Sequence, residues 1–185
     1  MNVFEALKDR FGMGPEPMYY HQAKAKRIAV AAAYIAQKVF WKKPLRMSVT
    51  DFYNTALIYR AVHPDNEVIY NGKKQFDTNM HDQRCWYSLQ IAHERGIYTS
   101  LIQEEVIKGE ARLLEAEIIR MAEAIVELRY SGGAKEEFSE FLAKFTTEDR
   151  VSGKVLSLIG TPAIKYWWEC EEMLQIEIER KIWLS

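Results

Sequence analysis

The stretch "KAKRIAVAAAYIAQKVFW", Lys24–Trp41, decides what kind of fold the rest of the chain must join. Alanine is the best helix former, and its small side chain lets a neighbouring helix approach closely. The stretch therefore predicts a long, packed helix over about residues 19–41. Its longest apolar run, "IAVAAAYIA", is far shorter than the roughly 20 residues that a membrane span needs, so the sequence predicts no span.

Further helices are predicted on both sides of this one. "GMGPEP" (Gly12–Pro17) separates it from a short amphipathic helix at Val3–Phe11, because glycine and proline do not continue a helix. "SVTD" (Ser48–Asp51) has the spacing of a capping box and begins a helix that His63-Pro64 ends. The later predicted helices cover about residues 82–95, 99–130, 134–145 and 148–159, and a last one in which Thr161 is the N-cap and Pro162 the first helical residue.

One short segment has the pattern of strands. "EVIYNGKKQF" (Glu67–Phe76) places Asn71-Gly72 between two extended runs, and Asn-Gly accepts the positive φ angles of a type I′ turn. We interpret it as a connector between helices. The predicted fold class is therefore mainly α: a bundle of about six to seven helices with one small β-hairpin at about 67–76.

The predicted helix over residues 99–130 carries a heptad-like seam. Its apolar positions alternate steps of four and three over about three heptads, the pattern of a helix that packs along one side. Two interpretations stay open: the seam is buried in the bundle, or it contacts another chain. With two tryptophans of the last helix, the predicted interface residues are Ile107, Leu114, Ile118, Met121, Ile125, Leu128, Trp167 and Trp168.

Charge is unevenly distributed along the chain. Residues 1–77 hold 12 Lys/Arg against 7 Asp/Glu, a net of +5, and residues 78–185 hold 13 against 19, a net of −6. Such halves can present unlike surfaces to unlike partners. We divide the chain into a basic N-terminal helical part with the hairpin, 1–96, and an acidic helical part, 97–185. The two parts also fit one continuous domain.

The basic residues of the first part suggest contact with nucleic acid. A helix at Phe52–Val62 followed by a basic hairpin is similar to a winged helix, with Asn54, Thr55, Tyr59 and Arg60 as the reading side chains. The order of basic part, heptad-like helix and acidic tail is similar in layout, without a shared motif, to phage terminase small subunits. The predicted contact residues are Lys24, Lys26, Arg27, Lys42, Lys43, Arg46, Arg60, Lys73 and Lys74.

Only one pair of residues suggests catalysis. The tandem His81-Asp82 is similar to the metal-binding pair of HD-type phosphohydrolases, in which the metal activates water. In that family the pair follows an apolar helix, whereas "FDTNM" precedes it here, and Asp149 is the only later aspartate. We therefore predict no catalytic residue, no cofactor and no metal site, with His81 and Asp82 as the only weak metal candidates. Cys85 and Cys170 lie far apart and favour a reduced compartment.

The sequence favours a non-catalytic helical interaction or scaffold subunit of a larger protein assembly. The alternatives are a nucleic-acid-associated helical protein, of winged-helix or phage-packaging type, and a metal-dependent HD-type phosphohydrolase. The expected partners are other protein chains, in a homo- or hetero-oligomer, with nucleic acid as a further candidate. We expect a soluble, intracellular protein, located in the cytoplasm or in a large assembly such as a virion.

Overall fold

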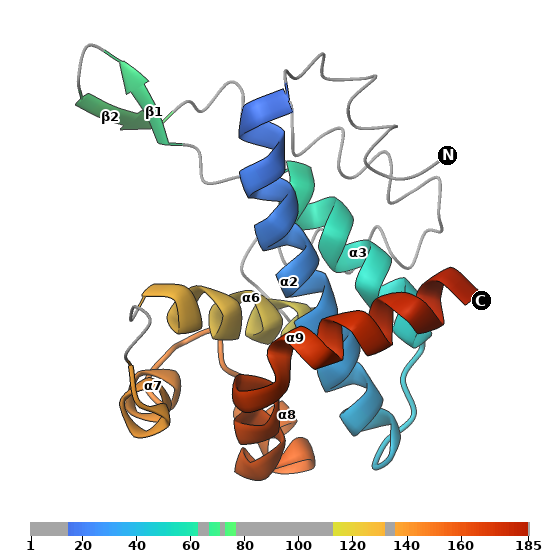
Figure 1. Cartoon of the computed structure of the whole chain (residues 1–185). Helices are drawn as coiled ribbons and strands as arrows, with labels where there is room; N and C mark the ends of the chain where they lie inside the picture. Colours follow the sequence, from blue (N-terminus) through green and yellow to red (C-terminus); the bar gives the residue numbers. More distant parts are fainter. Residues whose placement is uncertain (1–14, 63–66, 71–72, 77–112, 132–135, 185) are drawn as a thin grey trace.

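A computed structural model describes residues 15–62, 67–70, 73–76, 113–131 and 136–184, with side chains over 24–57, 113–131 and 136–182. The described part of the chain is mainly helical, which confirms the predicted class (Figure 1). Its six helices are α2 (Pro15–Phe40), α3 (Val49–Val62), α6 (Leu114–Ser131), α7 (Phe138–Phe145), α8 (Gly153–Ile159) and α9 (Thr161–Leu184).

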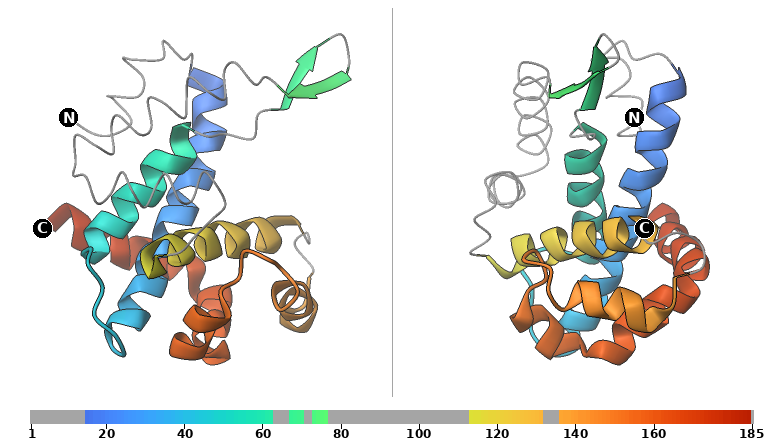
Figure 2. Two further views of the ribbon diagram at one scale, coloured as in Figure 1. Left: turned by 180° about the vertical axis from the view of Figure 1, so that it is seen from behind. Right: turned by 90° about the vertical axis from the view of Figure 1, so that its left-hand side faces the viewer.

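The alanine-rich helix α2 is the central element of the fold. It packs against α3, α6, α8 and α9, with α3 running beside it (Figure 2). A helix that is apolar on all sides is buried on all sides, and every residue from Ile28 to Ala36 is buried. Side chains from all six helices join one hydrophobic core around it.

Helix α2 begins earlier than predicted. We expected "GMGPEP" to prevent helix formation through Pro17, but the helix begins at Pro15. The first turn of a helix has N–H groups without an intrahelical acceptor, so prolines at Pro15 and Pro17 cost no hydrogen bond there.

The capping box before α3 is confirmed. The Ser48 hydroxyl accepts a hydrogen bond from the Asp51 N–H at 3.1 Å, and an Asp51 carboxylate oxygen accepts from the Ser48 N–H at 3.1 Å. The same oxygen also accepts from the Ser48 hydroxyl at 2.8 Å. These bonds satisfy N–H groups that lack intrahelical partners and fix where α3 begins.

The predicted helix over 99–130 is not continuous. Leu113 is a bend and α6 begins at Leu114, so the seam is interrupted where we predicted an unbroken heptad run. Glu115 and Glu117 lie in the first turn of α6, where the positive end of the helix dipole favours carboxylates. The buried Glu115 carboxylate also accepts a hydrogen bond from the Arg46 N–H at 3.0 Å, which ties the start of α6 to the α2–α3 connection.

Two later helices begin after their predicted positions. Residues 136–137 precede α7, which begins at Phe138, whereas we predicted helix there. Helix α8 begins at Gly153, whereas we predicted it from Glu148. The Ser152 hydroxyl caps α8 by accepting from the Val155 N–H at 3.2 Å. Side-chain capping thus overrides the apolar pattern at this boundary.

Arg150 holds the α7–α8 connection against α6. Its guanidinium lies 3.2 Å from a Glu123 oxygen, 2.5 Å from a Glu127 oxygen and 2.9 Å from a Glu148 oxygen. The hydrogen bond from Arg150 lowers the pKa of Glu148 below its usual range. The residues that we predicted as the start of α8 therefore form a charged anchor.

Helix α9 bends at Cys170, whose φ of −123° and ψ of 23° are not helical. Figure 1 shows the two segments running in different directions. The first segment brings Trp167 against Phe141 of α7, with ring centroids 6.3 Å apart. The second brings Glu179 within 3.2 Å of the Tyr53 hydroxyl of α3. The kink lets one helix pack against two separate neighbours, as its wide apolar arc predicts.

The strands β1 (Glu67–Tyr70) and β2 (Lys73–Phe76) pair antiparallel, with Glu67 opposite Phe76 and Tyr70 opposite Lys73. Asn71 and Gly72, where we predicted the turn, lie outside the described residues, as do the predicted helices at Val3–Phe11 and over 82–95. The type I′ turn therefore stays a prediction.

Candidate functional site

The structure does not describe every predicted site residue. His81, Asp82 and Ile107 lie outside the described residues. The side chains of Tyr59 and Arg60, and those of Lys73 and Lys74 in β2, are also not described. The predicted metal pair and the basic hairpin therefore stay predictions.

The remaining basic residues lie in two separate places. Lys24 forms an ion pair with Glu127 of α6 at 3.4 Å, and the Arg27 guanidinium lies 4.3 Å from the centre of the Tyr130 ring. Lys26, which lies between Lys24 and Arg27 in the sequence, is half-buried. Lys42, Lys43 and Arg46 are exposed beyond the other end of α2. Lys24 and the helix end at Phe40 are 16 positions apart, which corresponds to roughly 24 Å at 1.5 Å per residue, so the two groups do not form one patch.

The winged-helix interpretation of α3 meets a steric obstacle. Thr55, one of its predicted reading residues, is 1% exposed and packs inside the core. Asn54 beside it is half-buried. A side chain enclosed by its own fold cannot contact a base edge, so Thr55 does not serve as a reading residue.

The predicted interface residues lie in the core of this chain. Leu114, Ile118, Met121 and Ile125 are buried in the core cluster that residues of α2 also join, and Leu128 is half-buried against the same core. Trp167 is also fully buried. The seam needs no partner chain to remove it from water. Of the two interpretations left open by the sequence, this packing favours a core helix.

A groove at the kink of α9 gathers the most varied chemistry among the described residues. It has a volume of about 690 Å³. Its walls come from α2, α6 and α9, and consist of Arg27, Arg129, Tyr130 and the run Trp168–Met173. Sequence reasoning named Arg27 and Trp168 but missed the others, because no proline or glycine marks the kink at Cys170.

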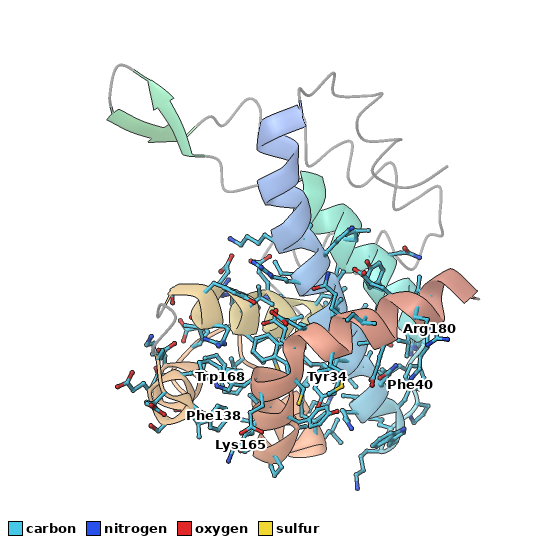
Figure 3. All side chains as sticks on the ribbon, in the orientation of Figure 1. Tyr34, Phe40, Phe138, Lys165, Trp168 and Arg180 are labelled. Carbon is cyan, nitrogen blue, oxygen red and sulfur yellow. The ribbon has the colours of Figure 1, made fainter. Side chains whose placement is uncertain are left out.

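Both arginines of the groove are stacked on aromatic rings. The Arg27 guanidinium lies over Tyr130, and the Arg129 guanidinium lies 3.6 Å from the centre of the Trp168 ring. Trp168 in turn packs beside Phe138, at a centroid distance of 5.9 Å (Figure 3). Stacking fixes the planes of the guanidinium groups while leaving charge at the groove wall.

A tyrosine–glutamate pair lies beside these arginines. The Tyr130 hydroxyl donates to one Glu171 oxygen at 2.6 Å. The other Glu171 oxygen is buried and has no hydrogen-bond partner among the described residues. Burial raises the pKa of Glu171 above its usual range, and burial together with the Glu171 bond raises the pKa of Tyr130 to about 12. The pair thus places a carboxylate that burial disfavours beside the groove wall.

We expect Glu171→Gln to stabilise the protein at pH 7. The raised pKa means that the folded state disfavours the carboxylate, so the contribution of Glu171 is fully favourable below its unfolded pKa and is lost as pH rises through the folded pKa. Glutamine keeps a carbonyl acceptor for Tyr130 without the charge. Urea unfolding at pH 7 and near pH 4 measures this: the gain should shrink at the lower pH. Glu172→Gln, at an exposed neighbour, is the control. Destabilisation at pH 7 would contradict the assignment.

Comparison with known proteins found no match, whether to a protein-family model, a curated protein or a solved structure. Within the described residues, no group of three or more His, Cys, Asp or Glu side chains could hold a metal ion. No helix of that same part is long and apolar enough to cross a membrane. The function is therefore inferred from the chemistry of this chain's own surface.

Proposed function

We propose that the protein is a non-catalytic helical interaction subunit, which binds another protein chain through the surface around the α9 groove. The observation that carries the proposal is a set of large apolar side chains left exposed there. Tyr130 is 48% exposed, Met173 is 50% exposed and Ile176 is 69% exposed. We call these three residues the α9 surface.

The α9 surface has the composition of a protein interface. Tyr130 and Met173 both line the groove, and Ile176 follows Met173 by three residues, so the two side chains are neighbours on one helix face. Aromatic residues, methionine and arginine are enriched in protein interfaces, and the groove supplies all three. The anchors that dominate binding energy are most often Trp, Tyr and Arg.

The charge of the groove indicates the partner's chemistry. Glu169, Glu171 and Glu172 outnumber Arg27 and Arg129, and both arginines are already stacked on rings. A partner segment that combines apolar side chains with one lysine or arginine complements this surface, because Glu169 and Glu172 place exposed carboxylates along the groove. The chain's own basic N-terminal half supplies such groups, so we take a second copy as the partner.

The expected result is an oligomer that the double variant Met173→Glu, Ile176→Glu converts to a monomer. Two added carboxylates beside Glu172 and Glu177 would have to be buried against the partner without counter-charges, which costs several kcal/mol. Gel filtration with light scattering measures the mass. Both residues are exposed in the monomer, so thermal melting should confirm an intact fold.

The matched control is Lys154→Glu, an exposed residue of α8 that lies outside the groove. It makes the net charge more negative by the same amount as Met173→Glu with Ile176→Glu. Because it leaves the α9 surface unchanged, the oligomer should persist. A wild-type protein that stays monomeric at high concentration would contradict self-association through this surface.

The β-hairpin and its connecting role also remain a proposal. We propose that residues 67–76 form a connector with a type I′ turn at Asn71-Gly72, because Asn-Gly accepts the positive φ angles of that turn and lies between two short runs, "EVIY" and "KKQF". The hydrolase alternative at His81-Asp82 gains no support from the described residues.

A further inference from the structure

The connection between α2 and α3 carries the most exposed aromatic side chain of the described residues. Trp41 is 74% exposed and its neighbour Phe40 is 37% exposed. Phe40 lies at the lower end of α2, away from the groove (Figure 3). Tryptophan is on average highly buried, so a largely solvated indole is an informative exception. We call residues 38–46 the tip.

The backbone of the tip is held in place by the core. Val39, within the tip, and Met47, which follows it, are buried. The N–H groups of Lys42 and Lys43 both donate to the Val39 carbonyl, at 2.9 and 2.8 Å, and the Arg46 N–H donates to the buried Glu115 carboxylate. Trp41 is therefore presented outward on an anchored turn, and a partner that binds it has little backbone entropy to overcome.

The tip is strongly and uniformly basic. Lys42, Lys43 and Arg46 are exposed, and Lys38 is half-buried one turn earlier. No aspartate or glutamate occurs between Glu16 and Asp51. A cluster of one sign raises the local concentration of an opposite polyion and speeds its association. The chemistry of the tip therefore fits a polyanion with flat, stackable groups.

The position of Lys38 distinguishes between two such polyanions. Its ammonium lies 4.2 Å from the centre of the Trp41 ring and covers one side of the indole. Inserting that indole into a lipid surface would strip water from the ammonium, which is costly. Stacking a base on the indole leaves the ammonium close to water and phosphate, and the cation–π contact persists. The geometry favours nucleic acid over an anionic membrane.

We propose that the tip binds single-stranded nucleic acid, with Trp41 stacked on a base and Lys42, Lys43 and Arg46 in contact with phosphates. Unpaired strands are the fitting class because their bases can be splayed onto an aromatic side chain, whereas bases in a duplex are already stacked on each other. The proposal goes beyond the α9 surface, from which it is independent. It also gives the predicted basic residues at this end of α2 a shared partner.

Fluorescence anisotropy with the full chain and a labelled oligothymidylate of about 16 nucleotides tests the proposal. The wild type should bind at about 50 mM salt, with affinity falling steeply as salt rises, because bound cations release counterions. Trp41→Ala should weaken binding about tenfold through the lost stacking and leave the salt slope unchanged. Trp41→Phe should retain most of the affinity. Lys42→Glu with Lys43→Glu should remove most of the binding and flatten the slope.

The control variant is Lys154→Glu, a charge reversal at an exposed residue of α8 outside both proposed surfaces, which should leave oligonucleotide binding unchanged. Three results would overturn the proposal: no oligonucleotide binding at about 50 mM salt, an affinity that Trp41→Ala does not change, or equal affinity for a duplex of the same length. Trp41-dependent binding to phosphatidylserine vesicles without oligonucleotide binding would assign the tip to membranes. Trp41→Ala should leave the oligomer mass unchanged. The proposal for the tip and the proposal for the α9 surface can therefore be contradicted independently of each other.

Discussion

Replacing Ile118 by asparagine should lower the free energy of unfolding by about 3–5 kcal/mol, the combined effect of a lost buried side chain and an unsatisfied amide. Ile118 is fully buried between α6 and α2, in the middle of the predicted seam. The change removes apolar volume and places an amide where no water reaches. Urea unfolding measures the difference. The expected loss is a large fraction of the stability of a typical domain.

The same substitution at Ile176 is the matched control. Ile176 is 69% exposed, so Ile176→Asn should change the free energy of unfolding by no more than about 0.5 kcal/mol. If Ile118→Asn instead left unfolding unchanged and altered only the oligomer mass, the seam would be an interface and its burial within the chain would be wrong. The pair thus decides between the two interpretations that the heptad pattern allows.

The parts of the fold that the sequence predicts well depend on neighbours in the chain. Ser48 and Asp51 form their capping box from residues three apart, and the structure contains that box. The alanine-rich stretch predicts its helix because propensity accumulates over many residues. The apolar stripe of the last helix likewise places Ile164, Leu174 and Ile178 in the core.

The parts that the sequence did not predict depend on contacts between distant residues. The kink at Cys170 has no proline or glycine, and it lets the first segment of α9 contact α7 and the second contact α3. The apolar pattern of the helix does not identify either neighbour. The start of α8 is moved by Arg150, whose partners Glu123 and Glu127 lie on α6. A one-dimensional pattern contains the residues of such contacts but not their pairing.

The groove was not predicted for the same reason. Arg27 and Tyr130 are more than a hundred residues apart, and so are Arg27 and Glu171. The sequence shows each as an ordinary member of a helix, and only the crossing of α2, α6 and α9 brings them together. The exposure of Trp41 is equally invisible in sequence, because a tryptophan at the end of an apolar helix is more often buried. The groove beside the proposed α9 surface therefore depends on a crossing of helices that the sequence does not show.

Replacing Trp167 by alanine is the second change with a large expected effect, a loss of about 3–5 kcal/mol. Trp167 is the largest of the fully buried side chains in the described part, and its ring lies against Phe141. Truncation would leave a cavity where the first segment of α9 meets α7, and the groove next to it should widen. Thermal and urea unfolding measure the loss, and Trp41→Ala, at the exposed tip, should be close to neutral by comparison.

Trp167→Phe separates packing from polarity at this position. The indole N–H of Trp167 is buried and has no hydrogen-bond partner in the part of the chain that the structure describes, and an unsatisfied donor costs about 1–3 kcal/mol. Phenylalanine removes that donor while keeping most of the aromatic contact, so the loss should be about 1 kcal/mol or less. A loss as large as that of the alanine variant would mean that the N–H has a partner in the folded protein. That partner would have to be sought on the α7 side of the core, because Trp167 packs there between Phe141 and the rest of α9.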